Sequence, residues 1–143
     1  MRVIVEPLIG SRVSSLISIF SGITSRQLDM FDYCQTLGEV YTGFVDGEFI
    51  CCWGLIPPSF ISNQAYLWMW APEPMKYQFT FIRQSQLQVQ KMLERYEYII
   101  GDCIPSNHSA QRWLKWLGAE FEMPRNGMLP FVIRRGKWPI HQA

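Results

Sequence analysis

Apolar residues recur along the chain with two different periods, and each period predicts a type of element. Short runs rich in Val, Ile, Trp and Phe, bounded by Pro, Gly or Asp, are typical of strands. The strands expected from such runs cover residues 3–5, 40–45, 49–56, 65–70, 98–104, 120–123 and 131–135. Between the second and third runs lies Asp46-Gly47, a dipeptide that tolerates the positive φ angles of a tight hairpin turn. A hairpin followed by a third strand is therefore expected in the first half of the chain.

Apolar residues spaced three and four positions apart predict four helices between these strands. The expected helices run from Ser11 to Gly22, from Thr24 past Phe31, over 76–96, and from Ser106 or Asn107 to Gly118. The face of the longest helix that we expect to be buried carries Phe79, Ile82, Val89, Leu93 and Tyr96. The buried stripe of the last helix is expected to consist of Ala110, Trp113, Leu114 and Leu117.

The order of these elements predicts an α/β protein with a mixed sheet of the α+β kind. A hairpin and a third strand, followed by strand–helix–strand, imply both parallel and antiparallel neighbours. We expect about six to seven strands, with helices on both faces because the strands are so apolar. The 143 residues suit a single domain over 1–143.

Composition narrows the class of protein. Hydrophobic residues make up 48% of the chain and charged residues 17%, which excludes an intrinsically disordered protein. The net charge of +1 provides no basic surface for nucleic acid. No apolar stretch approaches the length of about 20 residues that crosses a bilayer, and the N-terminus lacks a signal-peptide pattern. We therefore expect a protein that is not secreted and that binds neither nucleic acid nor a membrane.

The cysteines and histidines do not predict a metal site. Cys34, Cys51, Cys52 and Cys103 show no Cys-x-x-Cys spacing, and the only histidines are His108 and His141. Two adjacent cysteines within an expected strand are typical of buried free thiols in an intracellular protein. We expect no bound metal.

One segment carries a resemblance to a known family. Residues 99–110 and 113–118 resemble the strand and helix that form a motif of the GNAT (Gcn5-related N-acetyltransferase) superfamily, with Asn107, Ala110 and Gly118 in register. The order of elements resembles that family over most of the chain. Residues 93–96 and 107–121, with the tryptophan-bearing strand upstream, are also similar to small phage acetyltransferase-like proteins. These phage proteins are related to an internal virion protein of T7-like phages.

The resemblance implies acyl transfer from acyl-CoA to an amine, but two parts of that chemistry depart from the family pattern. The family binds the CoA diphosphate on a glycine-rich turn before its long helix. Here residues 70–77 hold no glycine and include Pro72, Glu73 and Pro74, which removes two N–H donors and adds a negative charge. Leu114 stands where many family members have a tyrosine that protonates the leaving thiolate.

The candidate site residues follow from this comparison. If acetyl-CoA binds, the resemblance implies contacts from Met69, Ala71, Lys76 and Asn107; otherwise no cofactor is expected. No catalytic residue is assigned, although Tyr96, Tyr98 and Cys103 are open as substitutes for the missing tyrosine. Carboxylates near the hairpin, which could act as a general base, are expected to be solvated turn and strand-end groups: Glu39, Asp46 and Glu48.

Aromatic residues make up 15% of the chain, and their positions indicate both core and interface roles. We expect a buried position for Trp68, Trp70 and Trp113, and partial exposure for Trp116 and Trp138. Exposed Trp and Arg are common anchors of protein interfaces. A docking surface could therefore form from Arg134, Arg135, Lys137 and Trp138; an ordinary basic tail is the alternative.

Two functions compete on these observations. The first is a phage virion or assembly protein built on a degenerate GNAT fold, in the virion or the host cytoplasm. It would act by contacts with other virion proteins of the portal, tail or internal core, and could self-associate. The alternative is an active acyl-CoA-dependent N-acetyltransferase that modifies a protein or a small amine.

Overall fold

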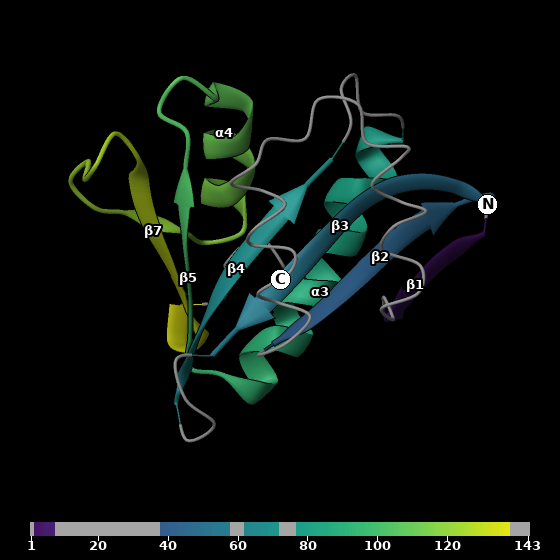
Figure 1. The fold of residues 1–143 in the computed structure, drawn as a ribbon, viewed down its shortest axis with the longest axis horizontal. Helices are drawn as coiled ribbons and strands as arrows, with labels where there is room; N and C mark the ends of the chain where they lie inside the picture. Colours follow the sequence, from purple (N-terminus) through teal and green to yellow (C-terminus); the bar gives the residue numbers. More distant parts are fainter. Residues whose placement is uncertain (1, 8–37, 58–61, 72–76, 138–143) are drawn as a thin grey trace. The chain divides into compact units, whose positions relative to one another are not determined.

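The computed structural model describes residues 2–7, 38–57, 62–71 and 77–137. Its strands are β1 (Val3–Pro7), β2 (Glu39–Val45), β3 (Glu48–Ile56), β4 (Gln64–Trp70), β5 (Tyr98–Cys103), β6 (Glu120–Phe121) and β7 (Leu129–Arg134) (Figure 1). Its helices are α3 (Gln78–Arg95), α4 (His108–Trp116) and the short 3-10 helix η2 (Arg135–Lys137). The two helices expected over 11–22 and 24–31 lie outside the described residues.

The strands form one mixed sheet in the order β1-β2-β3-β4-β5-β7-β6. Strands β4 and β5 are parallel and are joined through α3, whereas β5 pairs with β7, and β7 with β6, in antiparallel fashion. The expected fold class and all the expected strands are thus confirmed. Helices on both faces stay a prediction, because two of the four expected helices lie outside the described residues.

The chain divides into two compact units. Unit 1 comprises Met1–Ile56 and Leu67–Gln78, and unit 2 comprises Pro57–Tyr66 and Phe79–Ala143. Strand β4 therefore contributes its first three residues to unit 2 and the rest to unit 1. The expectation of one domain over 1–143 stays a prediction.

Unit 1 is built on the expected hairpin. Asp46 and Gly47 have φ angles of 50° and 81°, which places both in the left-handed region that this turn requires. Strands β2 and β3 pair from Glu39–Leu55 to Val45–Glu48, with a shift of register between Gly43 and Phe44, and β1 extends the ladder on the other edge of β2 (Figure 1). Trp68 and Trp70 are buried as expected, and the Trp70 ring stacks on Phe49 at 6.3 Å between centroids.

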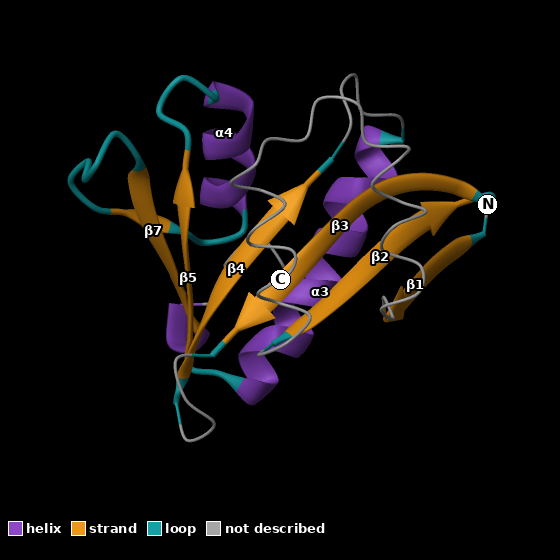
Figure 2. Cartoon of the chain, in the orientation of Figure 1, coloured by secondary structure: helices purple, strands orange, loops and turns teal. Residues whose placement is uncertain are grey.

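Unit 2 centres on β5, which lies between β4 and β7. Ile99 and its partner on β7, Ile133, are fully buried. Helices α3 and α4 (Figure 2) contribute buried side chains to this unit: Val89, Met92 and Leu93 from α3, Leu114 from α4, and Leu117 directly after α4. Gly118, with a φ angle of 93°, ends α4 as its sequence predicts.

Two expectations about buried faces are corrected. Phe79 is 87% exposed and Ile82 is 36% exposed, although the spacing of apolar residues assigns both to the buried face of α3. A period of 3.6 residues identifies which face of a helix is apolar. It does not tell how much of that face is covered by neighbouring elements. Trp113 is half-buried rather than fully buried, and its indole N–H donates to the Ser85 hydroxyl on α3.

Candidate functional site

The carboxyl end of β5 in unit 2 is the best candidate for a functional site. Within unit 2, β4 and β5 are in parallel register over three pairs, Gln64–Tyr98, Ala65–Ile99 and Tyr66–Ile100, and β5 continues to Cys103. On its other side β5 pairs with the antiparallel strand β7. Ligands of open α/β sheets bind at the carboxyl ends of parallel strands, where the direction of strand connection changes. Asp102 and Cys103 occupy that position.

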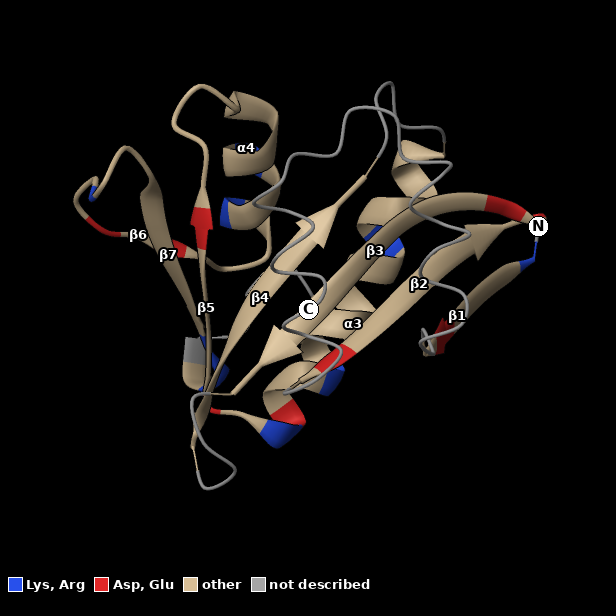
Figure 3. Cartoon of the chain, in the orientation of Figure 1, with Lys and Arg blue, Asp and Glu red and all other residues tan. Residues whose placement is uncertain are grey.

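A tyrosine–carboxylate pair marks this end of β5. The Tyr66 hydroxyl donates to Asp102 Oδ2 at 2.9 Å. Register places Tyr66 opposite Ile100, so Asp102, two residues further along β5, lies on the same face of the sheet. Asp102 is exposed, and it is the one acidic residue of β5, seen as the red band on that strand in Figure 3.

The main chain of Asp102 also points away from β7. Pro130, its partner on β7, has no N–H, and the Pro130 carbonyl accepts from the Glu122 N–H. In an antiparallel ladder the two residues of such a pair direct their N–H and C=O groups outward. The Asp102 main-chain N–H and C=O groups are therefore directed to the edge of β5 that lies away from β7.

Helix α4 begins close to this point, and Asn107 is its cap. The Asn107 Oδ1 accepts from the Ala110 N–H at 3.0 Å, and the Gln111 side chain donates to the Pro105 carbonyl at 2.7 Å. The expectation that Ser106 or Asn107 caps the helix is confirmed for Asn107. Asn107, the residue that stands out in the GNAT-like motif, thus has a structural role as the cap of α4. Its contact with a cofactor stays a prediction.

The three candidate substitutes for the missing tyrosine lie in different places. Cys103 is buried at the carboxyl end of β5, and burial raises the pKa of its thiol, which makes it a weaker acid than an ordinary cysteine. Tyr98 lies at the opposite end of β5, and Tyr96 follows α3, with the Arg95 guanidinium 5.2 Å from its ring. Leu114 is only 3% exposed, so it fills the core in place of a proton donor.

The other predicted site residues belong to unit 1 or lie outside the described residues. Met69, in β4, is half-buried. Ala71, the first residue after β4, is also half-buried. Lys76 lies outside the described residues, together with Pro72, Glu73 and Pro74. The roles of Met69, Ala71 and Lys76 in binding a cofactor stay predictions.

Two of the three carboxylates near the hairpin have the solvated surroundings expected of them. Asp46 and Glu48 are exposed, and Glu39 is half-buried. Asp46 Oδ1 accepts from the Arg2 N–H at 2.8 Å, which ties the turn to the start of β1. Asp46 and Glu48 are therefore solvated turn and strand-end groups, as expected.

The cysteines of the described residues are buried and free, as expected: Cys51, Cys52 and Cys103. Cys34 lies outside this part of the chain. Over residues 2–7, 38–57, 62–71 and 77–137, no group of three or more His, Cys, Asp or Glu side chains could hold a metal ion. The same residues contain no helix that is long and apolar enough to span a bilayer.

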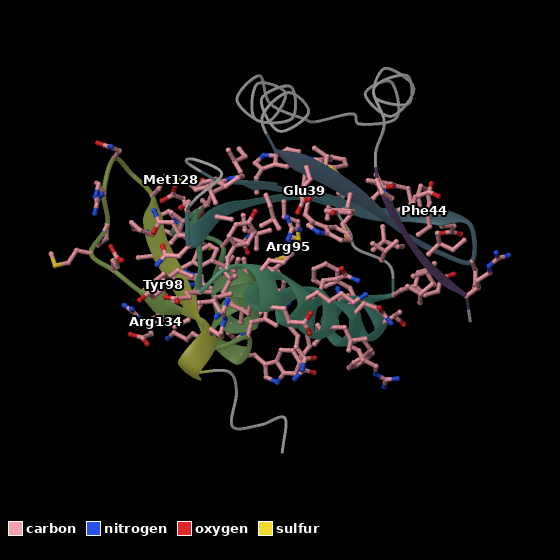
Figure 4. All side chains as sticks on the ribbon, turned by 90° about the horizontal axis from the view of Figure 1, so that it is seen from below. Glu39, Phe44, Arg95, Tyr98, Met128 and Arg134 are labelled. Atoms are coloured by element: carbon pink, nitrogen blue, oxygen red, sulfur yellow. The ribbon has the colours of Figure 1, made fainter. Side chains whose placement is uncertain are left out.

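The arginines of the expected docking surface have partners inside unit 2. The Arg134 guanidinium lies 5.5 Å from the Tyr98 ring centre and 3.8 Å from Glu120 Oε1. Figure 4 shows Tyr98 and Arg134 beside each other, away from Met128. Arg135 donates from Nε to the Leu93 carbonyl at 2.5 Å, so it closes the C-terminal end of α3. Trp138 lies outside the described residues.

Sequence reasoning missed the pairing of Tyr66 with Asp102. Both residues lie in strands that the sequence predicts correctly, and Asp102 lies inside the segment that carries the GNAT resemblance. The pairing depends on the register between two parallel strands that are separated by a helix. No local pattern sets that register, so only the structure reveals which β4 residue reaches Asp102.

Solved structures share this fold over nearly the whole chain. A Bacillus subtilis acetyltransferase in complex with CoA is 12% identical, with a TM-score of 0.67 over 93% of this chain and 97% of that one. A GNAT family acetyltransferase from Elizabethkingia anophelis with acetyl-CoA bound is 14% identical, with a TM-score of 0.69 over 92% and 97%. A mutant spermidine N-acetyltransferase from Vibrio cholerae is 11% identical, with a TM-score of 0.72 over 98% and 99%.

These matches show that the chain has the GNAT acetyltransferase fold. No protein-family model matches the sequence, and no curated protein matches it either. The structural matches establish the fold. At sequence identities of 10–14% they do not establish the activity, which has to be argued from the site.

Proposed function

We propose that this protein is an acyl-CoA-dependent N-acyltransferase. The observation that carries the proposal is the extent of the structural match, because acetyltransferases solved with CoA or acetyl-CoA bound cover 92–93% of this chain. A fold of this size that had lost its ligand site would be free to lose or rearrange peripheral elements, yet the match extends to 97% of each of those two structures. Bound acetyl-CoA would supply the acyl group as a thioester.

The residues present fit part of such a cofactor. The Asp102 main-chain groups, directed away from β7, can donate to and accept from an amide-bearing chain. Met69, Ala71, Lys76 and Asn107 are the further contacts predicted from the sequence. The diphosphate is the difficult part, since residues 72–76 offer two prolines and a carboxylate but no glycine. We therefore expect weaker binding of the diphosphate than a glycine-rich turn would give.

A second candidate function, action through protein contacts without a cofactor, follows from the lack of glycine in residues 72–76. A chain that binds no acyl-CoA and acts through protein contacts would have no need of the glycine turn or of the proton donor that Leu114 replaces. The phage virion role is one form of this candidate, and it rests on the likeness of residues 93–96 and 107–121 to phage proteins. Exposed apolar side chains such as Phe79 would serve contacts of this kind.

Acyl transfer can be tested without knowing the natural acceptor. Acetyl-CoA and the purified protein would be incubated with a panel of primary amines: peptides with free N-termini, lysine peptides and diamines. We expect release of the CoA thiol together with a product that is heavier by one acetyl group, both absent when protein is omitted. Thiol release without acetylated product in any member of the panel would contradict the proposal.

A further inference from the structure

We propose that Asn126 is a modification site: its side-chain amide is lost spontaneously, which leaves aspartate and isoaspartate at the tip of the hairpin between β6 and β7 (Figure 3). The reaction consumes water and needs no enzyme, and it does not depend on the proposed acyltransferase function. The inference is carried by the turn at this tip, where Asn126 is followed by glycine and both residues are exposed.

The first step concerns the geometry of the turn. Asn126 and Gly127 have φ angles of 53° and 75°. Around them the main chains of Arg125 and Met128 exchange two hydrogen bonds, of 2.9 and 3.0 Å. Two successive positive φ angles inside such a bridge are typical of the tight hairpin turn that favours Asn-Gly. Because the bridge is made by Arg125 and Met128, the Gly127 N–H has no part in it.

The second step concerns the chemistry that a following glycine permits. The Gly127 main-chain nitrogen attacks the side-chain carbonyl carbon (Cγ) of Asn126, and its proton leaves with the side-chain nitrogen as ammonia. The product is a five-membered imide ring, which water opens at either of its two carbonyl groups. One opening gives aspartate, and the other gives isoaspartate, in which the main chain runs through the former side chain. Glycine hinders this attack less than any other neighbour because it has no Cβ.

The third step concerns how easily the turn opens, since ring closure requires rotation of the main chain about Asn126. Between the bridge and the pairing of β6 with β7, two residues, Met123 and Pro124, lie opposite only one, Leu129. The ladder is therefore interrupted by a bulge, and Pro124 has no N–H to add to it. Residues 122–127 are all exposed. Exposed main-chain bonds with few buried apolar contacts open at low cost, so this tip can open while unit 2 stays folded.

The chain has two other asparagines, Asn63 and Asn107, and both are held. The Asn107 side chain caps α4, and the Asn63 side chain donates to Glu97 Oε2 at 3.4 Å. The nitrogen that would have to attack is bonded in both cases, because the N–H groups of His108 and Gln64 each donate to a nearby oxygen. Neither asparagine is followed by glycine. We therefore expect both to deamidate far more slowly than Asn126.

The Asp46-Gly47 turn of unit 1 provides a second comparison, because an aspartate before glycine can form the same ring. Its ladder reaches the turn without interruption, with Val45 and Glu48 as a register pair. The Asp46 N–H donates to the Arg2 carbonyl, and Asp46 Oδ1 accepts from the Arg2 N–H, both at 2.8 Å. A carboxylate is also a poorer target for attack than a neutral amide. This turn should therefore form isoaspartate more slowly than the tip that carries Asn126.

The two products change the tip in different ways. Aspartate tolerates the left-handed region as asparagine does, but it adds a negative charge next to Arg125, whose guanidinium lies 3.8 Å from Glu122 Oε2. Isoaspartate lengthens the main chain of a two-residue turn by one CH₂ group. The bridge between Arg125 and Met128 depends on the two-residue geometry, so isoaspartate should break it.

The test follows the masses of three tryptic peptides after incubation of the full chain at mildly alkaline pH. Trypsin cleaves after Lys and Arg, so the three asparagines fall on separate peptides, 27–76, 96–112 and 126–134. We expect peptide 126–134 to gain about 1 Da, as a hydroxyl replaces an amino group, and to separate into two chromatographic forms. Its rate should exceed that of either other peptide by roughly tenfold or more. A digest at time zero corrects for deamidation during digestion.

Variants and an unfolded reference identify the cause. Gly127→Ala places a Cβ on the attacking residue and should slow the reaction roughly tenfold, both in the folded chain and in urea, where the turn is absent. Gly136→Ala, a matched change outside the turn, should leave the rate unchanged. The folded chain should react within about tenfold of the chain in urea, since the tip opens locally. A folded chain that keeps Asn126 intact while the chain in urea deamidates would overturn the inference, as would equal rates at Asn126 and Asn107.

Discussion

At the scale of single residues, Trp113 shows how one side chain ties two helices of unit 2 together. Its ring lies 5.3 Å from that of Phe81, and its indole N–H donates to the Ser85 hydroxyl at 2.9 Å. The Ser85 hydroxyl in turn donates to the Ile82 carbonyl at 2.7 Å. A half-buried tryptophan with a bonded N–H therefore contributes through both packing and a hydrogen bond.

Trp113→Phe should lower the free energy of unfolding by about 1 kcal/mol beyond the change in packing, because Phe keeps one aromatic ring but lacks the indole N–H. Ser85→Ala removes the same hydrogen bond from the other side. The double variant should therefore lose less than the sum of the two single losses in denaturant unfolding. Strictly additive losses would show that the hydrogen bond contributes nothing.

Cys51 predicts a pH dependence of stability. Burial raises the pKa of its thiol to about 12, whereas an unfolded chain has an ordinary cysteine, with a pKa of about 8.5. Between these values the unfolded state releases a proton that the folded state keeps, so the free energy of unfolding falls as pH rises from about 9 to about 12. Cys51→Ala should flatten this decline in unfolding measured at several pH values. An unchanged decline would contradict the raised pKa.

At the scale of elements, the parts that the sequence predicts correctly are those with a local cause. The Asp46-Gly47 turn, the Asn107 cap and the Gly118 stop each follow from the conformational or hydrogen-bonding property of one or two residues. No such local property sets how much of α3 is buried or how β4 pairs with β5, because both depend on neighbours far away in the sequence. For this reason the expected burial of Phe79 was wrong. For the same reason no sequence pattern indicates the contact between Tyr66 and Asp102.

The hairpin turn offers a matched pair of glycine substitutions. Gly47 has a φ angle of 81° and nothing within 4 Å of an added Cβ, so Gly47→Ala should cost about 1 kcal/mol from backbone conformation alone. Gly136 also has open space around an added Cβ but no positive φ, so Gly136→Ala should leave stability nearly unchanged. Thermal unfolding of the two variants makes the comparison. Equal melting temperatures would mean that the turn does not require a left-handed residue.

At the scale of the whole molecule, the order of elements was enough to predict the fold, since a mixed sheet with one parallel crossover permits few topologies. It was not enough to predict the site. The sequence indicates what is missing from the acetyltransferase pattern, namely glycines in 72–76 and a tyrosine at the position of Leu114. The structure adds what is present at the carboxyl end of β5, which is the Asp102 carboxylate and its main-chain groups.

The central claim is that a GNAT fold with this altered turn still binds its acyl donor, and calorimetric titration with acetyl-CoA tests it most directly. The account predicts saturable binding with a dissociation constant in the micromolar range, weakened by added inorganic diphosphate. Absence of binding heat at millimolar acetyl-CoA, confirmed by equilibrium dialysis, would contradict the claim.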